Sequence, residues 1–219
     1  DLAIGNTNDF PIAQSLRDLF LAIRKFQPAF LTGEERVEAV SNIEFNIHWG
    51  LGSSSSLLNN LARWSDVDPF QLHFLISGGS GYDVAVAQKG VPLIYTLKEG
   101  IPGVDEVVFD PVFKDSLYFA WLGKKSHSAE AVEGFAAMEG DHKDECDEVT
   151  SITFDLLRSN NIVDFSRLIN RHEDIISAVL GRKPLKKSRF GDFNGAVKSL
   201  GAWGGDFALF VSDYPREYV

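Results

Sequence analysis

The stretch HWGLGSSSSLLNNLARW, residues 48–64, constrains the fold more than any other part of the chain. Four consecutive serines are followed at once by apolar residues at the spacing of one helix face: Leu57, Leu58, Leu61 and Trp64. A flexible linker would not end so abruptly in a helical pattern. The serines are therefore predicted to open a helix.

The residues before the serines favour a strand. Apolar side chains occupy every second position, at Ile43, Phe45, Ile47 and Trp49, which is the period of a half-buried strand. The predicted order is strand, glycine loop, helix. Glycines permit a tight turn there, and the first amides of a helix lack internal partners at the positive end of its dipole. Such a junction binds anions, phosphate above all.

The composition fits a globular chain that binds small molecules. With 219 residues, of which 44% are hydrophobic and 12% aromatic, it can bury the core of one large or two small domains. A net charge of −10 argues against nucleic acid as a partner. No apolar stretch approaches membrane-spanning length, and the opening DLAIGNTNDF is not a signal peptide. The single Cys146 excludes an internal disulfide and predicts a reducing, cytoplasmic location.

The pattern of elements predicts an α+β chain with two lobes, residues 1–111 and 112–219. Glycine, proline and acidic residues become dense in EGIPGVDEVVFDPVFKD, which places the boundary near Pro111. Helices are expected at residues 15–26, just after GSGYD, over most of 130–158 and, as one or two helices, at 163–181. Strands are expected at residues 91–97, 116–123 and 206–212.

Two common nucleotide-loop templates do not fit the serine loop. The Walker pattern requires a lysine followed by Ser or Thr after its last glycine, and no lysine follows Gly52 in the loop. The dinucleotide fingerprint requires a third glycine where Ser55 stands, and the GSGYDV stretch has Val84 where it would need one. The loop therefore belongs to a different type.

Three glycine-containing stretches follow one another: GLGSSSS at residues 50–56, GGSGYDVA at 78–85 and KSLGAWGGD at 198–206. In this order they resemble the motifs of the GHMP kinases, the superfamily named for galactokinase, homoserine kinase, mevalonate kinase and phosphomevalonate kinase. Within that superfamily the chain looks most like the bacterial group named for the string GYDIA, written here GYDVA. The resemblance covers the chain from about Ser41 to its end.

The resemblance implies a two-lobed GHMP kinase fold. Its N-terminal lobe would be like domain 2 of ribosomal protein S5, its C-terminal lobe would be a ferredoxin-like α/β domain, and the active site would lie in the cleft between them. It also implies ATP and Mg²⁺ as cofactors. Phosphoryl transfer needs positioning and charge compensation more than covalent help, so a helix N-terminus, a cation and a carboxylate beside the acceptor are enough.

By the same resemblance, the serine loop wraps the β- and γ-phosphates, the Ser54 hydroxyl binds magnesium, and Asp83 deprotonates or orients the acceptor hydroxyl. The nucleotide-binding residues that it implies are Gly50, Leu51, Gly52, Ser53, Ser54, Ser55, Gly201, Ala202 and Gly204. The substrate-binding residues that it implies are Ser80, Gly81, Tyr82, Lys124 and Ser126.

The chain departs from the family pattern in several places. The early lysine and the Gly-Glu-Tyr-like strand of these kinases are not found, and LTGEERVEA is only a faint echo. Either a preceding segment is missing from this sequence, which we favour, or the protein lacks part of its nucleotide site. Ser55 and Ser56 replace alanines, and Leu200 and Trp203 alter the third motif. No Glu or Asp lies between Phe70 and Ser80, where mevalonate kinases place a magnesium-binding Glu.

Each site assignment has a purely structural alternative. The serine loop could be a serine-capped helix, and Asp83 could be the N-cap of a short helix. Residues 201–205 could form a tight turn into the following strand. Lys124 and Ser126, at the end of a strand, could lie in a solvated loop rather than face an anionic acceptor.

Other polar clusters have weaker patterns. DHKDEC, residues 141–146, matches no zinc spacing. The basic run over residues 182–189 is read as a solvated connection between helices. His172, in a helical pattern, is read as structural rather than catalytic.

The sequence therefore favours a kinase that phosphorylates a hydroxyl or phosphate of a small, mevalonate-like metabolite, as a monomer or homodimer. Two alternatives stay open. One is an ATP-dependent decarboxylase of the same superfamily. The other is a non-catalytic ligand-binding or regulatory module on the same fold.

Overall fold

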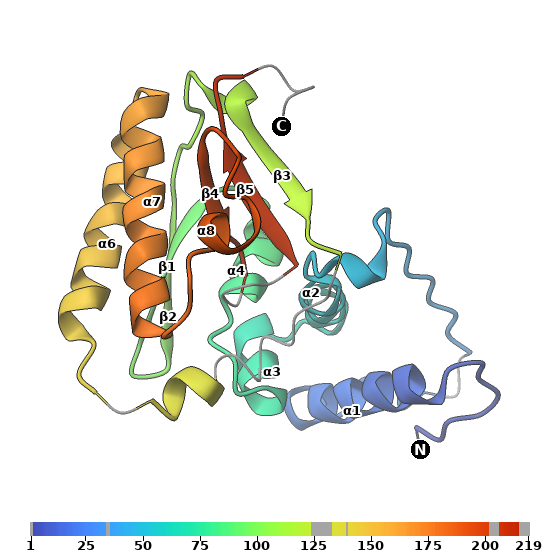
Figure 1. The fold of residues 1–219 in the computed structure, drawn as a ribbon. Coiled ribbons are helices and arrows are strands. Elements are labelled where there is room, and N and C mark those ends of the chain that lie inside the picture. The colour runs from blue at the N-terminus through green and yellow to red at the C-terminus, as the bar shows by residue number, and fades with distance from the viewer. Residues whose placement is uncertain (1, 34–35, 124–132, 139, 202–205, 215–219) are drawn as a thin grey trace. The chain divides into compact units, whose positions relative to one another are not determined.

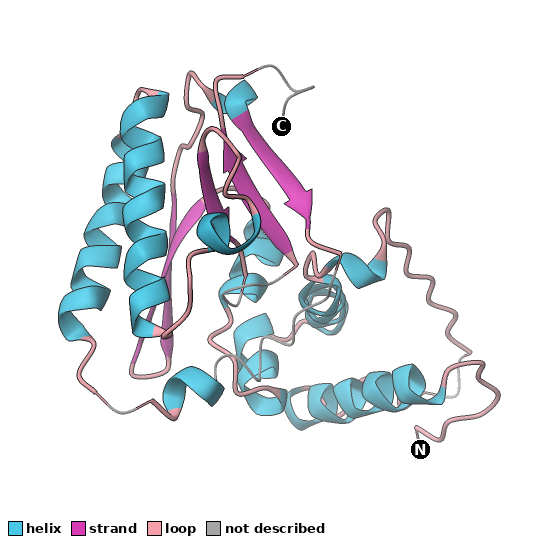
Figure 2. Cartoon of the chain, viewed as in Figure 1, coloured by secondary structure: helices cyan, strands magenta, loops and turns pink. Residues whose placement is uncertain are grey.

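The computed structural model describes residues 2–33, 36–123, 133–138, 140–201 and 206–214. Unit 1 comprises Asp1–Ile47 and Leu51–Val107, and unit 2 comprises His48–Gly50 and Val108–Val219. Each unit combines helices with a small antiparallel sheet (Figures 1 and 2). The protein is therefore α+β, as predicted.

Unit 1 contains helices and a β-hairpin. Its helices are α1 (Phe10–Phe26), α2 (Ser53–Ser65), α3 (Pro69–Ile76) and α4 (Tyr82–Lys89). The strands β1 (Leu93–Lys98) and β2 (Ile101–Glu106) pair antiparallel, with Leu93 opposite Glu106. Helix α1 and strand β1 confirm the elements predicted at 15–26 and 91–97.

Capping residues set where two of these helices begin. The Asp9 carboxylate accepts a hydrogen bond from the backbone N–H of Ile12 at 3.0 Å and starts α1. The Asp68 carboxylate accepts one from Gln71 at 2.9 Å and starts α3, whose first residue is a proline. Both follow the preference for aspartate at the N-cap with proline just inside the helix.

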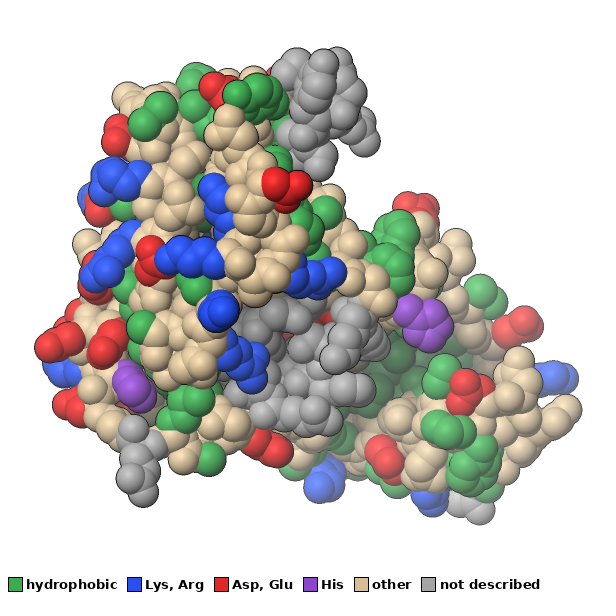
Figure 3. Space-filling model, in the orientation of Figure 1, with side chains coloured by type: hydrophobic (Ala, Val, Ile, Leu, Met, Phe, Trp, Pro, Cys, Tyr) green, Lys and Arg blue, Asp and Glu red, His purple; other side chains and the backbone are tan. Residues whose placement is uncertain are grey.

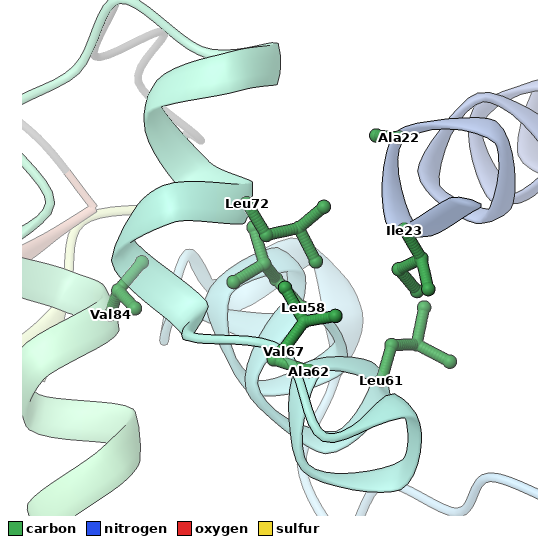
Figure 4. Packing of buried hydrophobic residues seen from close by; sticks show 8 residues of the cluster. All are labelled: Ala22, Ile23, Leu58, Leu61, Ala62, Val67, Leu72 and Val84. Carbon is green, nitrogen blue, oxygen red and sulfur yellow. The ribbon is translucent and has the colours of Figure 1, made fainter. Parts of the chain in front are cut away.

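A single apolar cluster holds the helices of unit 1 together. Ile23 of α1, Leu58 and Leu61 of α2 and Leu72 of α3 point toward one another (Figure 4). Ile23, Leu72 and Val84 are 0% exposed. Burying side chains of this size contributes about 1.5–3 kcal/mol each, so this cluster stabilises the packing of the four helices.

Unit 2 is built on a three-stranded sheet. The elements along the chain are η2 (Lys114–Ser116), β3 (Leu117–Trp121), α6 (Lys143–Arg158), α7 (Ile162–Val179), α8 (Leu185–Arg189), β4 (Ala196–Ser199) and β5 (Phe207–Val211). The strand order is β3-β5-β4, and both pairs are antiparallel. The predicted strands at 116–123 and 206–212 are confirmed, and α7 is one helix.

Both faces of the central strand β5 are covered. Leu209 and Val211 pack with Phe165 and Ile169 of α7 on one face. Ala208 and Phe210 pack on the other face with residues around α8, and Figure 1 shows α6 and α7 side by side next to the sheet. A strand buried on both faces needs no polar alternation, which explains the continuous apolar run FALFV.

The strand predicted over residues 43–49 is wrong. Residues 42–46 form no strand, and Ile47–Trp49 form the short 3₁₀ helix η1. Alternation produces a strand only where a neighbouring strand supplies hydrogen bonds. In the described part of unit 1, the sheet contains only β1 and β2, and Ile43 and Ile47 stay 40% and 46% exposed.

Basic side chains gather on unit 2 around α8 (Figure 3). The connection predicted over residues 182–189 contains the short helix α8. Lys187 pairs with Asp174 at 3.1 Å, and Lys186 donates to the carbonyl of Gly195 at 2.5 Å. Among the described residues, no helix is long and apolar enough to cross a membrane.

Candidate functional site

The serine loop leads directly into α2. Helix α2 begins at Ser53, and its N-cap is Gly52 in the left-handed conformation, with φ at +77°. No side chain caps this end of the helix, so the alternative of a serine-capped helix is wrong. The first amides of α2 are left to an external acceptor, which is the arrangement that binds phosphate at a helix N-terminus.

The space beside Gly52 is open. A Cβ built at Gly52 would meet no atom of the described residues within 4 Å. Its positive φ, rather than crowding by the protein, is what favours glycine here. A ligand approaching the first turn of α2 can therefore come close to the backbone.

Gly50, at the start of the serine loop, lies against the third motif. A Cβ at Gly50 would collide with the carboxyl group of Asp206, and both residues belong to unit 2. The neighbouring Trp49 ring makes an edge contact with Phe207 at 6.5 Å between centroids. Glycine is favoured at position 50 both by its positive φ of +72° and by the closeness of the Asp206 side chain.

Asp83 lies in the first turn of α4. The N-cap of α4 is Gly81, with φ at +85° and no side-chain cap, so the alternative that Asp83 is the N-cap is wrong. The Asp83 Oδ1 atom accepts a hydrogen bond from the Val84 amide at 3.0 Å. Because Asp83 is only partly buried, its remaining acceptor positions can reach a ligand.

A hydrogen bond joins the serine loop to Asp83. The Ser55 hydroxyl, on a side chain 5% exposed, donates to Asp83 Oδ2. The two motifs are separated by 28 residues in the chain and meet inside unit 1. The first turns of α2 and α4, both without side-chain caps, are therefore linked through one serine and one carboxylate.

Two side chains hold the loop before Asp83. The Tyr95 hydroxyl donates to the carbonyl of Ser80 at 2.5 Å. His73 Nε2 lies 3.1 Å from the carbonyl of Gly79, and since a carbonyl only accepts, this nitrogen is the donor. The predicted substrate residues Ser80 and Tyr82 are exposed. The loop is therefore held through its backbone carbonyls while these two residues stay accessible to solvent.

Tyr95 is also electrostatically close to Asp83. Burial raises the pKa of Tyr95 above its usual 10.0, and the negative charge of Asp83 raises it further. The Phe70 ring stacks on Tyr95 with centroids 6.5 Å apart. Tyr95 therefore keeps its proton at neutral pH and acts as a hydrogen-bond donor.

The third motif begins in a buried polar cluster of unit 2. Glu173, 4% exposed, accepts hydrogen bonds from the backbone N–H and the hydroxyl of Ser199, at 3.1 and 2.8 Å. The Lys198 ammonium lies 3.6 Å from the same carboxylate oxygen and donates to His172 Nδ1 at 3.1 Å. The Lys198 ammonium is therefore engaged by Glu173 and His172 within unit 2. The bonds from Ser199 to Glu173 hold the end of β4 just before Gly201.

The charges in this cluster shift two titrations. Burial, together with the positive charge of Lys198, lowers the pKa of His172 from 6.5 to about 4. Burial also lowers the pKa of Lys198, against the opposing effect of Glu173. His172 is neutral at pH 7 and accepts from Lys198, which fits the structural role predicted for it.

The remaining predicted residues divide into described and undescribed ones. Leu51 and Ser54 are exposed at the start of α2, and Gly201 has a φ of +71° after β4. Four of the predicted site residues lie outside the described residues: Lys124, Ser126, Ala202 and Gly204.

Acidic metal ligands are not gathered anywhere in the described chain. Within it, no group of three or more His, Cys, Asp and Glu side chains is placed to hold a metal ion. Cys146 of the DHKDEC stretch is exposed on α6. Magnesium often keeps several waters and is held by phosphates with one or two protein ligands, so Ser54 with a bound nucleotide is a compatible donor set.

Two sizeable cavities of unit 2 lie elsewhere. One, of about 660 Å³, is lined by Arg189, Phe190, Tyr214 and neighbouring residues. Another, of about 680 Å³, lies beside α7 and the end of β5. Among the described residues, none that lines either cavity is a predicted site residue.

His73 and Tyr95 were not predicted from the sequence. Tyr95 lies in a predicted strand, and its hydroxyl group was the signal that could have marked it as a hydrogen-bond donor to the site. His73 lies on α3, a helix that was not predicted, although Asp68 followed by proline is a typical helix start.

Comparison with known proteins gives a fold likeness without a function. No family model and no curated protein matches the chain. The fold is similar to that of a Lin0012 protein from Listeria innocua, with a TM-score of 0.63 and 17% identical residues. The likeness covers 99% of this chain and 75% of that one. At this identity it shows a shared fold alone.

Proposed function

We propose that the chain is an ATP-dependent small-molecule kinase of the GHMP type, with the two-lobed fold of that superfamily. It would transfer the γ-phosphoryl group to a hydroxyl or a phosphate of a small, mevalonate-like metabolite. The observation that carries the proposal is the hydrogen bond from Ser55 to Asp83. It places a carboxylate beside the uncapped helix start to which phosphates would bind.

In the proposed reaction, the amides that follow Gly52 hold the β- and γ-phosphates of the substrate ATP, in the open space beside that glycine. Magnesium bound with the nucleotide would neutralise phosphate charge, with the Ser54 hydroxyl as a protein ligand. Helix dipole and amides compensate the charge that develops on the transferred group.

Asp83 would act on the acceptor. An ionised carboxylate has about four acceptor positions, and Ser55 and Val84 occupy one on each oxygen. A free position can receive the acceptor O–H. The acceptor oxygen then bonds to the γ-phosphorus, the bond to the bridging oxygen of ADP breaks with its electron pair leaving on ADP, and the hydroxyl proton passes to Asp83.

The test is turnover by the Asp83→Asn variant. ATP consumption by the parent is first screened against mevalonate-like acids, their phosphates and sugars. Since the carboxylate acts in the transition state, Asp83→Asn should lower kcat roughly 100-fold or more and leave ATP affinity nearly unchanged. Coupled-assay kinetics and calorimetric titration measure the two quantities.

Asp68→Asn is the matched control for this test. The Asp68→Asn substitution changes the same kind of side chain in the same unit. Asp68 caps α3, and asparagine caps a helix about as well as aspartate does. Its kcat should stay at the parental value. Equal kcat in the parent and Asp83→Asn would exclude a catalytic role for Asp83.

Two other outcomes would replace the proposed activity. ATP binding without turnover on any acceptor would favour the non-catalytic binding module. Release of carbon dioxide from an acid substrate together with ATP consumption would identify the decarboxylase branch.

A further inference from the structure

We propose that Ser55 is a positioning residue that fixes the Asp83 carboxylate and makes the phosphate loop and the acceptor-binding carboxylate a single rigid element. The inference rests on the proposed kinase activity and assigns a role to a side chain that phosphate binding alone does not require. Phosphate binding at a helix start uses backbone amides, whereas the Ser55 hydroxyl points to another helix.

The burial of Ser55 shows that its hydroxyl is not a solvent-facing group. The side chain is 5% exposed on α2 and donates to Asp83 Oδ2 on α4. A serine inside a helix ordinarily bonds back to a carbonyl of its own preceding turn, as Ser65 of the same helix does with the carbonyls of Leu61 and Ala62. Ser55 instead makes an interhelical bond to a charged acceptor, which is the stronger type.

The carboxylate of Asp83 is thereby held at both oxygens. The Val84 amide donates to Oδ1 at 3.0 Å, and Ser55 donates to Oδ2. Rotation about the terminal carboxyl torsion, which is broad in a free aspartate, would break one of these bonds. The free acceptor positions are therefore oriented before any acceptor arrives, which lowers the cost of reaching the reactive geometry.

The same bond couples two helix starts. Ser55 stands in the first turn of α2 and Asp83 in the first turn of α4. A displacement of the phosphate loop is transmitted to the carboxylate through a single hydrogen bond.

Kinetics of Ser55→Ala test the inference. Loss of one hydrogen bond to a charged group should lower kcat about tenfold, with KM for ATP changed less than about twofold. Ser65→Ala is the matched control, because it removes another buried hydroxyl from α2 that contacts only its own helix. Its kcat should equal that of the parent when both variants show the parental unfolding transition.

A double-variant measurement separates positioning from general damage to the fold. If Ser55 acts through Asp83, adding Ser55→Ala to Asp83→Asn should produce no further fall in kcat. A further tenfold fall in that background would overturn the inference, as would an unchanged kcat in Ser55→Ala alone. A parent without turnover would overturn the proposed function itself, and the inference with it.

Discussion

At the scale of single residues, His172 gives a prediction about pH. Its pKa is about 4 in the folded protein against 6.5 as the ordinary value, so between these pH values the unfolded chain binds a proton that the folded chain does not. The free energy of unfolding should therefore fall as pH decreases from 6.5 to 4. Because His172 is partly exposed, we expect a loss of roughly 1–2 kcal/mol rather than the full shift.

The variant His172→Gln isolates this contribution. A glutamine carbonyl can still accept from Lys198 but does not titrate. Urea unfolding at pH 6.5 and pH 4 should show a smaller difference in unfolding free energy for the variant than for the parent. The same difference in both proteins would mean that His172 titrates normally in the fold.

At the scale of elements, the glycine before α2 gives a prediction about binding. Gly52 and Gly100 have nearly the same φ, +77° and +78°, and a Cβ at either would meet no atom of the described part of the chain within 4 Å. Alanine at each should therefore cost a similar 1–2 kcal/mol or so through backbone strain. Only Gly52→Ala places a methyl group where phosphates would approach, so it alone should weaken ATP binding, by about tenfold or more.

Calorimetric titration of ATP into both variants measures this difference. Gly100 lies in the turn between β1 and β2, so Gly100→Ala reports the effect of strain without a nearby phosphate. Equal ATP affinity in the two variants would remove the serine loop from the nucleotide site.

The elements also show which parts of the fold a sequence can predict. Helices α1 and α7 have long amphipathic patterns with clear starts, and the apolar run of β5 marks a buried strand. These depend on local pattern and were predicted. Residues 43–49 have an equally clear alternation, but a strand also depends on a partner, which one segment cannot reveal.

Helix α3 and strand β2 were missed. Helix α3 is apolar on most sides, so it has no amphipathic period. Strand β2 carries a proline and a glycine, and it forms because it pairs with β1 along its whole length. For the site, Gly52 and Asp83 were predicted from motifs, whereas the Ser55–Asp83 and Tyr95–Ser80 contacts depend on how helices and strands pack.

At the scale of the whole molecule, each unit has cores of its own. The cluster around Leu72 contains residues of unit 1 alone, and those around Ile169 and Phe210 contain residues of unit 2 alone. Leu72→Ala should destabilise unit 1 by about 2–5 kcal/mol because it removes a side chain that is 0% exposed. Hydrogen exchange should then rise in α2, α3 and α4, with protection of β4 and β5 retained.

Ile169→Ala provides the reciprocal comparison. It should raise exchange in unit 2 and leave the helices of unit 1 protected, since Ile169 packs with β4 and β5 residues. Mass spectrometry of exchanged peptides resolves the two patterns. A uniform loss of protection in both units, from either variant, would show that the chain opens as one cooperative body.

The short segment His48–Gly50 belongs to unit 2 although unit 1 precedes and follows it in the chain. A cut between Val107 and Val108 therefore does not yield unit 2 intact. The fragment that begins at Val108 lacks the Trp49 ring that contacts Phe207 and the glycine that lies against Asp206. To obtain unit 2 with all of its residues, His48–Gly50 would have to be supplied as a separate peptide or joined to the fragment by circular permutation. A single cut in the chain therefore cannot separate the two units.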